Sequence, residues 1–327
     1  MPDLSVVIVN WNTRDLLRDC LNSIYSQTHD LDFDVWVVDN GSEDGSNEMV
    51  ENEFPSVILL KNSENLGFSK ANNQVMRRST STYFLLLNSD TRIVGNTLKG
   101  LVDHMERNPD AGGAGCKILN DDGSLQLSCG RFPTLWSILF GGEIINNFFR
   151  KVFRNKRFFA EYALSDSDHL RYQEVDIIKG CCLVLRKSVL EKIGLLDENY
   201  FMYFEEIDLC YRIKQSGMKI IYMPDYDVVH LGGQSTVTAY QSVYRNLYSQ
   251  EVFFSKNYGA MHAFALRVVV LAGALIRLPV YMTAYLLAGS ERKPFFRGRL
   301  EVNLYTLRWQ VLNFFNLPAK KTETIFS

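Results

Sequence analysis

Apolar and amphipathic segments alternate along residues 1–90. Strands are predicted at residues 4–9, 34–40, 56–60 and 83–90, each of which contains a run of mainly apolar, often β-branched side chains. Helices are predicted at residues 13–28, 43–53 and 68–79, where apolar side chains recur at helical spacing. Single helices between strands predict βαβ units and one parallel sheet.

Beyond Asp110 the strand-like runs become more irregular. Further strands are expected at residues 111–119, 124–128, 177–186 and 219–230. They predict a mixed sheet that extends the first one. The fold class is therefore α/β, with a mixed Rossmann-like sheet. No GxGxxG follows the first strand and no GxxxxGK[ST] occurs in the chain, so neither a dinucleotide-binding fold nor a P-loop fits.

The C-terminal part contains a long apolar stretch, Phe264–Gly289, without a single acidic residue. Arg267, Arg277 and Pro279 interrupt it. A transmembrane helix needs about 20 consecutive apolar residues, so a kinked pair of interfacial helices is expected rather than a clean span. A hairpin buried in a soluble homo-oligomer is the alternative. The basic residues that follow exceed the acidic ones, which suits anionic lipid head groups.

A second segment combines bulky apolar and basic side chains. Trp136–Phe159 interleaves phenylalanines with five basic residues between Arg150 and Arg157. This composition favours contact with a membrane surface or the acceptor. A solvated helix packed on the body of the protein is the alternative.

The totals limit the class of protein. With 327 residues, 46% of them hydrophobic, the chain is globular and long enough for about two domains. We expect a catalytic domain at 1–258, with 136–159 as an insertion, and a helical region at 259–327. A net charge of −2 argues against a nucleic-acid partner. The six cysteines lack metal-like spacing and the N-terminus lacks a signal peptide, so a location on the cytoplasmic side is expected.

Polar residues follow the predicted parallel strands, where such sheets bind their ligands. They are Asn10 and Asn12 after the first strand, Asp39 at the second, Asn65, Gly67 and Asn72 after the third, and Asn88 and Asp90 at the fourth. These groups meet at one edge of the sheet and predict a nucleotide pocket.

The stretch "YFEEIDLCYR" places three carboxylates at the start of a predicted helix. Acidic residues at a helix N-terminus are common for electrostatic reasons alone. Glu205, Asp208 and Arg212 fall on one side, and the last two have the spacing of a surface ion pair. Glu206 falls in line with apolar positions instead, where a carboxylate is costly unless it has a function.

Six motifs occur in this order along the chain: "SVVIVNWN", "VVDNGSEDGS", "ENLGFSKANN", "LLLNSD", "GCCLVLRKSVLEKIGLLDENYFMYFEEIDLCYRI" and "VVHLGG". Together they resemble family 2 glycosyltransferases of the GT-A fold, in particular the bacterial rhamnosyltransferase-like branch. The similarity covers about residues 4–255 and says less about the C-terminal region.

The resemblance implies a donor site. Asp39 matches the acid that holds the base or ribose of the nucleotide. Asp90 matches the last acid of the DxD motif, which binds Mn²⁺ or Mg²⁺ at the diphosphate of the donor; here Asn88 replaces the first acid. His230 matches the histidine that completes the metal site. Asn65, Gly67 and Asn72 match the loop beside the nucleotide sugar.

The resemblance also implies the acceptor side. Glu206 matches the catalytic base that takes the proton of the acceptor hydroxyl, although Glu stands where Asp is more common. Gly180, Glu205 and Asp208 are expected to support the acceptor and the base. If Glu206→Gln retained turnover, the role of base would pass to Glu205.

The predicted function is inverting, metal-dependent glycosyl transfer at the cytoplasmic face of the inner membrane of a bacterium, with the protein peripheral or shallowly inserted. The expected donor is dTDP-rhamnose, with UDP-sugars as alternatives. The expected acceptor is a glycan on a polyprenyl-diphosphate carrier, in cell-surface polysaccharide biosynthesis. Two other classes stay open: an inactive nucleotide-sugar-binding scaffold, and a nucleotidyltransferase.

Overall fold

The computed structural model describes residues 2–140, 168–232 and 239–314. Two compact units make up the chain, Met1–Phe132 with Ala163–Thr236, and Pro133–Tyr162 with Val237–Ser327. This division differs from the boundary expected after residue 258. The helix α10 (Ala239–Tyr258) packs on α11 (Ala260–Leu287) and α12 (Lys293–Phe314), and so it groups with the C-terminal helices.

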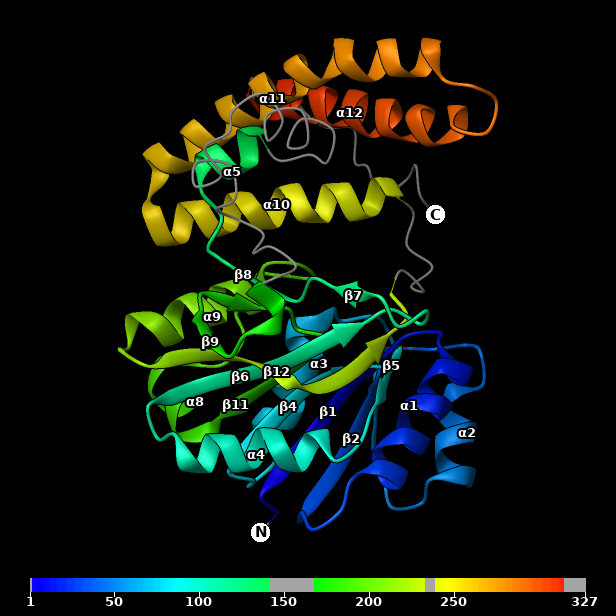
Figure 1. The fold of residues 1–327 in the computed structure, drawn as a ribbon, viewed down its shortest axis with the longest axis vertical. Coiled ribbons are helices and arrows are strands. Elements are labelled where there is room, and N and C mark those ends of the chain that lie inside the picture. Colours follow the sequence, from blue (N-terminus) through cyan, green and yellow to red (C-terminus); the bar gives the residue numbers. More distant parts are fainter. Residues whose placement is uncertain (1, 141–167, 233–238, 315–327) are drawn as a thin grey trace. The chain divides into compact units, whose positions relative to one another are not determined.

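The first unit begins with the predicted βαβ units (Figure 1). Its first strands are β1 (Leu4–Asn10), β2 (Phe33–Asp39), β3 (Ile58–Lys61) and β4 (Tyr83–Asn88). The helices between them are α1 (Arg14–Gln27), α2 (Ser46–Glu53) and α3 (Phe68–Met76). Strand β1 pairs in parallel with β2 and β4, and β2 with β3. The prediction of a parallel sheet is confirmed for this half.

The second half of the unit adds the irregular strands. Its elements are β5 (Thr91–Ile93), α4 (Thr97–Arg107), β6 (Ala111–Leu119), β7 (Leu125–Gln126), β8 (Cys129–Gly130), η1 (Asp168–Leu170), β9 (Gln173–Val175), β10 (Ile177–Ile178), β11 (Cys182–Arg186), α8 (Lys187–Ile193), α9 (Glu205–Gln215) and β12 (Lys219–His230). The main sheet runs β3-β2-β1-β4-β11-β6-β12-β5, with β7 on β6 and β9 on β12. Strand β11 is antiparallel to β4 and β6, so the sheet is mixed as predicted.

Helices cover both faces of this sheet. Apolar side chains of α1, α2 and α4 form one core with alternate residues of the strands, such as Val6 and Ile8 of β1. Helices α3, α8 and α9 cover the other face, where Ile213 of α9 and Val189 of α8 both approach Gly112 of β6. Because the central strands β1 and β4 are buried on both faces, their functional polar groups lie at their ends.

Two predicted elements differ in detail. The second helix begins at Ser46 rather than Glu43, because Gly45 before it has a left-handed backbone (φ 83°). The segment 177–186 forms two short strands instead of one, separated by Lys179–Cys181. This break brings backbone from the middle of the segment to the edge of the sheet where β4 ends, since Asn88 donates its backbone N–H to the carbonyl of Cys181 (3.2 Å).

In the second unit, α11 packs against α12, α10 and the short helix α5 (Leu135–Phe140). The sequence predicted a pair of helices broken near Arg277 and Pro279. The structure instead has one helix that continues through Pro279. Tertiary packing of α11 against α10, α12 and α5 outweighs the local preference of proline for a break. The remainder of the basic-aromatic segment 136–159, from residue 141 on, lies outside the described residues.

Candidate active site

Asn10 and Asp39 lie side by side at the ends of β1 and β2. Both side chains are buried, at 0% and 1% exposure. The Asn10 amide donates to Asp39 Oδ1 (2.9 Å), and the other oxygen, Oδ2, accepts from the backbone N–H of Ser42 (2.9 Å) and from Asn47 (3.0 Å). Asp39 therefore organises the loop after β2, and its predicted contact with the base or ribose stays a prediction.

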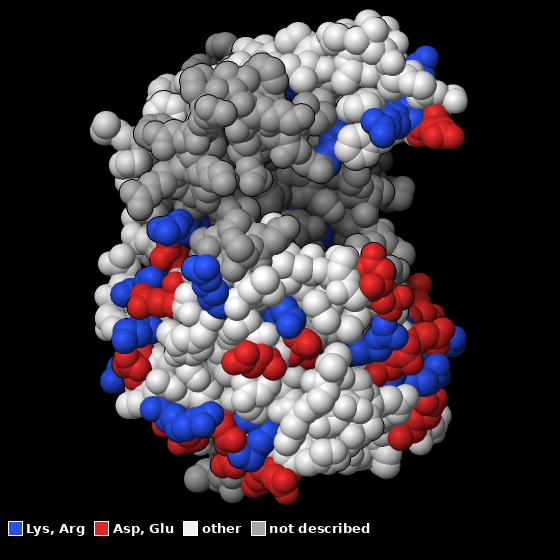
Figure 2. All heavy atoms as spheres, in the orientation of Figure 1, with Lys and Arg blue, Asp and Glu red and all other residues white. Residues whose placement is uncertain are grey.

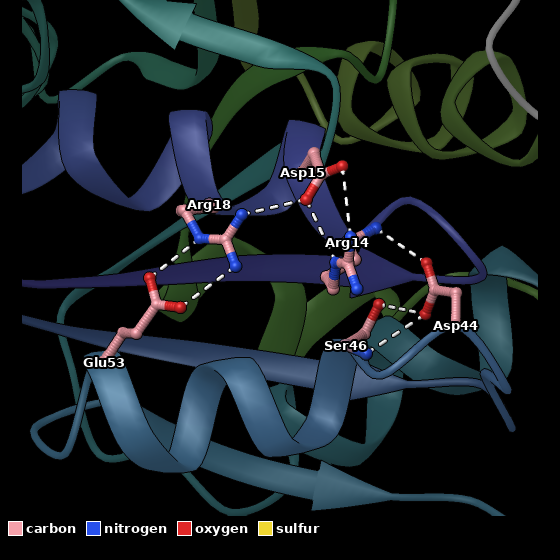
Figure 3. A network of polar contacts seen from close by, with 6 residues as sticks. All are labelled: Arg14, Asp15, Arg18, Asp44, Ser46 and Glu53. Carbon is pink, nitrogen blue, oxygen red and sulfur yellow. Dashed lines mark hydrogen bonds and ion pairs between the residues drawn. The ribbon is translucent and has the colours of Figure 1, made fainter.

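Hydrogen bonds also connect the loop after β2 to α1 (Figure 3). Asp44 accepts hydrogen bonds from the backbone N–H of Arg14 (2.8 Å) and from the backbone and hydroxyl of Ser46. Arg18 of α1 binds both carboxylate oxygens of Glu53 at the end of α2. Nearby, Asn12 accepts from the backbone N–H of Glu43. These contacts hold the first two strand-to-helix loops as one rigid edge.

The start of α3 is tied to the segment before α9. Asn65 accepts a hydrogen bond from the backbone N–H of Gly67 (3.0 Å). Gly67 has φ 81°, and a Cβ there would lie 2.5 Å from the carbonyl oxygen of Phe201. A glycine is thus required, but the close approach that the structure shows is that of protein backbone. Asn72 on α3 is fully buried, and its Oδ1 has no partner among the described residues.

The ends of β4 and β12 bring Asp90 and His230 together. Asp90 Oδ1 lies 3.2 Å from His230 Nε2, and both side chains are largely buried. His230 Nδ1 lies 2.7 Å from Gln126 Oε1, an acceptor, so Nδ1 carries the ring proton. The other ring nitrogen, Nε2, points toward Asp90 and toward the side-chain amide of Asn88, 3.2 Å away.

This arrangement fits a divalent cation. A carboxylate oxygen and the Nε2 atom of the imidazole face one another, and the oxygen acceptor at Nδ1 leaves Nε2 available as a ligand in the neutral ring, as is usual for metal-bound histidine. In the described parts of the chain, no group of three or more His, Cys, Asp or Glu side chains could hold a metal by itself. Asp90 and His230 therefore supply part of a coordination shell, which oxygens of a ligand and water could complete.

The start of α9 carries Glu205 and Glu206 on a strained backbone. Tyr203 and Phe204 immediately before it have φ of 70° and 69°, a left-handed conformation that bulky residues rarely adopt. Such strain concentrates at functional sites. The Glu205 side chain is 6% exposed, whereas Glu206 is half-buried. The Oε2 atoms of both accept no hydrogen bond from the described residues.

Burial perturbs both carboxyl groups. It raises the pKa of Glu205 well above its ordinary value, and the charge of Glu206 raises it further. Burial also raises the pKa of Glu206, although nearby backbone N–H groups and the charge of Lys179 act in the opposite direction. A carboxylate with a raised pKa is a stronger base at neutral pH than an exposed one.

The segment 179–181 connects the two halves of the site. On one side, the Cys181 carbonyl bonds Asn88 two residues before Asp90. On the other, a Cβ on Gly180 would lie 3.6 Å from Glu206 Cβ, an ordinary contact, so Gly180 lies beside the proposed base without being forced to be glycine by it. Burial raises the pKa of the Cys181 thiol to about 12, with smaller contributions that include the charges of Asp90 and Glu206.

Asp208 has a different role from the one expected of a surface pair. Its carboxylate bonds Arg212 (2.8 Å), as the spacing predicts, but Asp208 is 0% exposed and Arg212 donates to three carbonyls of residues 193–195. The prediction of a surface ion pair is wrong, because the segment after α8 covers this side of α9. Asp208 anchors the helix that carries Glu206.

Four polar residues of this edge were not predicted from the sequence. Asn40 bonds Asn65 and the carbonyl of Gly67, Ser42 bonds Asn10, Ser89 bonds Thr13, and Gln126 orients His230. The first three stand within the quoted motifs and could have been found there. Gln126 could not, because only the pairing of β7 with β6 brings it to β12.

Comparison with known proteins gives a consistent result. The family model described as glycosyl transferase family 2 matches residues 5–194, more than half of the chain. An N-acetylglucosaminyl-diphospho-decaprenol L-rhamnosyltransferase of Mycobacterium tuberculosis is 28% identical over 248 residues, 71% of this chain and 77% of the relative. The rhamnosyltransferase WbbL of Escherichia coli is 24% identical over 244 residues, 64% of this chain and 88% of the relative.

Solved structures agree on the fold. The mannosyltransferase PcManGT of Pyrobaculum calidifontis, solved in complex with GDP-mannose and Mn²⁺, superimposes with a TM-score of 0.58 at 17% identity and covers 96% of this chain and 88% of that one. GalNAc-T7, solved with UDP, GalNAc and Mn²⁺, gives a TM-score of 0.57 at 15% identity, over 97% of this chain and 59% of that one. The GT-A fold predicted from the sequence is therefore confirmed.

Proposed function

The chain belongs to glycosyl transferase family 2, and from this premise we propose that it is an inverting, metal-dependent enzyme whose base and donor site both adjoin segment 179–181. The observation that carries the proposal is that this segment bonds Asn88, two residues before Asp90, through the Cys181 carbonyl and lies beside Glu206 at Gly180. One base for the acceptor hydroxyl, with a separate site for the departing diphosphate, suits direct displacement at the anomeric carbon of the sugar.

In this proposal the edge formed by β1, β2 and β4 binds the nucleotide. Asn10, Asn12 and Asp39 shape the pocket, and Asn65, Gly67 and Asn72 lie toward the sugar. Asp90 and His230 would hold Mn²⁺ or Mg²⁺ together with the diphosphate, and Asn88 supports the ring of His230. When bound, the cation supplies the positive charge that stabilises the departing nucleoside diphosphate.

Glu206 would act on the acceptor. Its carboxylate accepts the proton of an acceptor hydroxyl while that oxygen attacks the anomeric carbon and the bond from carbon to diphosphate oxygen breaks. Glu206 lies beside Gly180 of segment 179–181 and is less buried as a residue than Glu205. Family membership favours this activity over nucleotidyl transfer. The intact Glu206 and the paired Asp90 and His230 speak against an inactive scaffold.

The names of the relatives support a substrate class. The mycobacterial relative is a rhamnosyltransferase that acts on a decaprenol-linked N-acetylglucosaminyl diphosphate. We extend this to a lipid-linked glycan acceptor and dTDP-rhamnose for the present chain, in cell-surface polysaccharide biosynthesis. The test is transfer from dTDP-rhamnose, UDP-sugars and GDP-mannose to a polyprenyl-diphosphate-linked N-acetylglucosamine, read by mass spectrometry. A mass increase from dTDP-rhamnose alone is expected, and release of free sugar or nucleotidyl products instead would contradict the proposal.

An enzyme that acts on a lipid-linked acceptor works at a membrane surface, and the second unit has an exposed apolar face that suits binding to one. Among the described residues, α11 is the one helix long and apolar enough to cross a membrane. One of its faces carries six side chains that are 44–85% exposed: Met261, Phe264, Val268, Leu275, Met282 and Leu286. Residues 239–314 hold nine Lys and Arg against three Glu, and the described atoms of this unit that are visible in Figure 2 are mostly white, with few charged side chains among them.

The packing of α11 favours lying on the membrane over crossing it. Its neighbour α12 carries Arg297, Arg299, Glu301 and Arg308, which would be costly in the hydrocarbon core. We therefore propose a peripheral, shallowly inserted enzyme at the cytoplasmic face of the inner membrane.

Negative charge on this apolar face should release the protein from lipid. Phe264→Glu combined with Leu286→Glu in the full chain should weaken sedimentation with anionic vesicles at least about tenfold, because burying each apolar side chain contributes about 1.5–3 kcal/mol. Ser255→Glu, which adds charge at an exposed position of α10, is the control and should bind as wild type does. Equal vesicle binding by the double variant would contradict a membrane role for α11.

A further inference from the structure

Glu205 is a buried carboxyl group for which the transfer reaction has no direct use. Its side chain is 6% exposed, and its Oε2 accepts no hydrogen bond among the described residues. Beside it in the chain, Glu206 also has an unpartnered Oε2. Two ionised carboxylates in such a place would be costly, because each loses its hydration without gaining enough donors and each repels the other.

The charges around the pair do not neutralise two negative groups. On α9 itself, Asp208 is also acidic, and its charge is matched by Arg212, which is further bound to three carbonyls. From the segment before β11, the exposed Lys179 favours the charged form of Glu206. The neighbouring thiols Cys181 and Cys210 both have a pKa raised to about 12, chiefly by burial, and are neutral. Among these neighbours, Lys179 is therefore the one cation left to balance the carboxyl groups of Glu205 and Glu206.

The surroundings of the two groups differ in a way that decides which one is neutral. Glu206 is half-buried, is reached by the charge of Lys179, and has backbone N–H groups of Glu206, Ile207 and Gly180 that favour its carboxylate. Glu205 is more deeply buried, and the single favourable contribution there comes from its own backbone. The backbone donors and the charge of Lys179 thus favour charge on Glu206.

From this geometry we propose that Glu205 is a positioning residue that holds a proton at neutral pH, so that the negative charge of the pair resides on Glu206 and faces the acceptor. The proposal rests on the proposed role of Glu206 as base and deepens it. A neutral Glu205 relieves the repulsion within the pair and keeps Glu206 ionised. It also ensures that one carboxylate alone is available to accept the proton of the acceptor.

The first test uses Glu205→Gln, because a glutamine side chain reproduces the size and neutrality of a protonated glutamate. The variant should lose less than about tenfold in turnover, equivalent to about 1.4 kcal/mol. Glu206→Gln should lose far more. A Glu205→Gln variant as inactive as Glu206→Gln, with donor binding retained, would overturn the proposal, since Glu205 would then act as a carboxylate.

The second test needs no activity. The pKa of Glu205 is raised on folding, so the stability that its neutral form contributes is complete below the unfolded pKa, about 4.3, and is lost as pH rises. As pH rises above that value, the melting temperature of wild type should therefore fall relative to that of Glu205→Gln. The control Glu198→Gln should keep a constant difference from wild type above that value, because the hydrogen bond from Asn73 lowers the pKa of Glu198 and the stability it contributes is lost only at lower pH. Parallel profiles for wild type and Glu205→Gln would overturn the proposal.

Infrared spectroscopy decides the matter even if Glu205→Gln fails to fold. Wild type and Glu206→Gln should both show the stretching band of a protonated carboxyl group at pH 7. Absence of the band from both proteins would overturn the proposal. If the band is present but Glu206→Gln keeps full turnover, the proton on Glu205 stands and the proposed catalytic base fails, so the two failures are distinguishable.

Discussion

Glu206→Gln should abolish measurable transfer while donor binding remains intact. Glutamine keeps the shape of the side chain but cannot accept the proton of the acceptor hydroxyl, and a positioned general base contributes about 10²–10⁴-fold to turnover. Turnover is to be measured with the lipid-linked acceptor, and donor binding by calorimetry. Because Glu206 must be ionised and burial raises its pKa, wild-type turnover should also fall on acidification at a pH above the ordinary range of glutamate.

Glu198→Gln is the matched control for this experiment. It is the same substitution at a more exposed glutamate that bonds Asn73 and Arg77, away from the proposed base. It should turn over as wild type does. Retained turnover in Glu206→Gln would transfer the role of base to Glu205, and loss of donor binding in that variant would mean that Glu206 belongs to the nucleotide pocket instead.

Asp90→Asn should remove the dependence of nucleotide binding on a divalent cation. The substitution preserves the side-chain shape but removes the one carboxylate that faces His230 Nε2. Mn²⁺ affinity, measured by calorimetry with the nucleotide present, should fall by at least about 100-fold, the upper end of the effect expected for residues that only orient a ligand.

Gln126→Ala provides the graded comparison. Gln126 touches the proposed metal site only through His230 Nδ1, so its removal should weaken Mn²⁺ binding by about 10–100-fold, less than Asp90→Asn. Equal Mn²⁺ affinity in wild type and Asp90→Asn would place the cation elsewhere.

The sequence was sufficient for the framework of the catalytic unit. Strands such as Leu4–Asn10 are mainly apolar because both faces are covered, and that pattern can be recognised without a structure. Polar residues at the carboxyl ends of such strands had to meet at one edge, as Asn10 and Asp39 do. The pairing of Asp90 with His230 was predicted only through the resemblance, because β4 and β12 are distant in the chain.

The features that were not predicted from the sequence depend on contacts between segments that are distant in the chain. The burial of Asp208 follows from the loop after α8, which periodicity within α9 cannot reveal. The same periodicity placed Glu205 on the outer side of the helix, yet it is the more buried of the two glutamates. Likewise, Pro279 marked a break by local preference, but packing carries α11 through it. In each case tertiary packing overrides a local pattern.

The most direct test of the account is a thermal-shift titration of the wild-type chain with dTDP, UDP and GDP, each with Mn²⁺ and with a chelator. Binding to the folded state raises the melting temperature. We predict that one nucleotide, dTDP on the present proposal, raises it by several degrees with Mn²⁺ and that chelation removes the effect. No shift with any nucleotide, or a shift that survives chelation, would contradict a metal-bridged diphosphate site at Asp90 and His230.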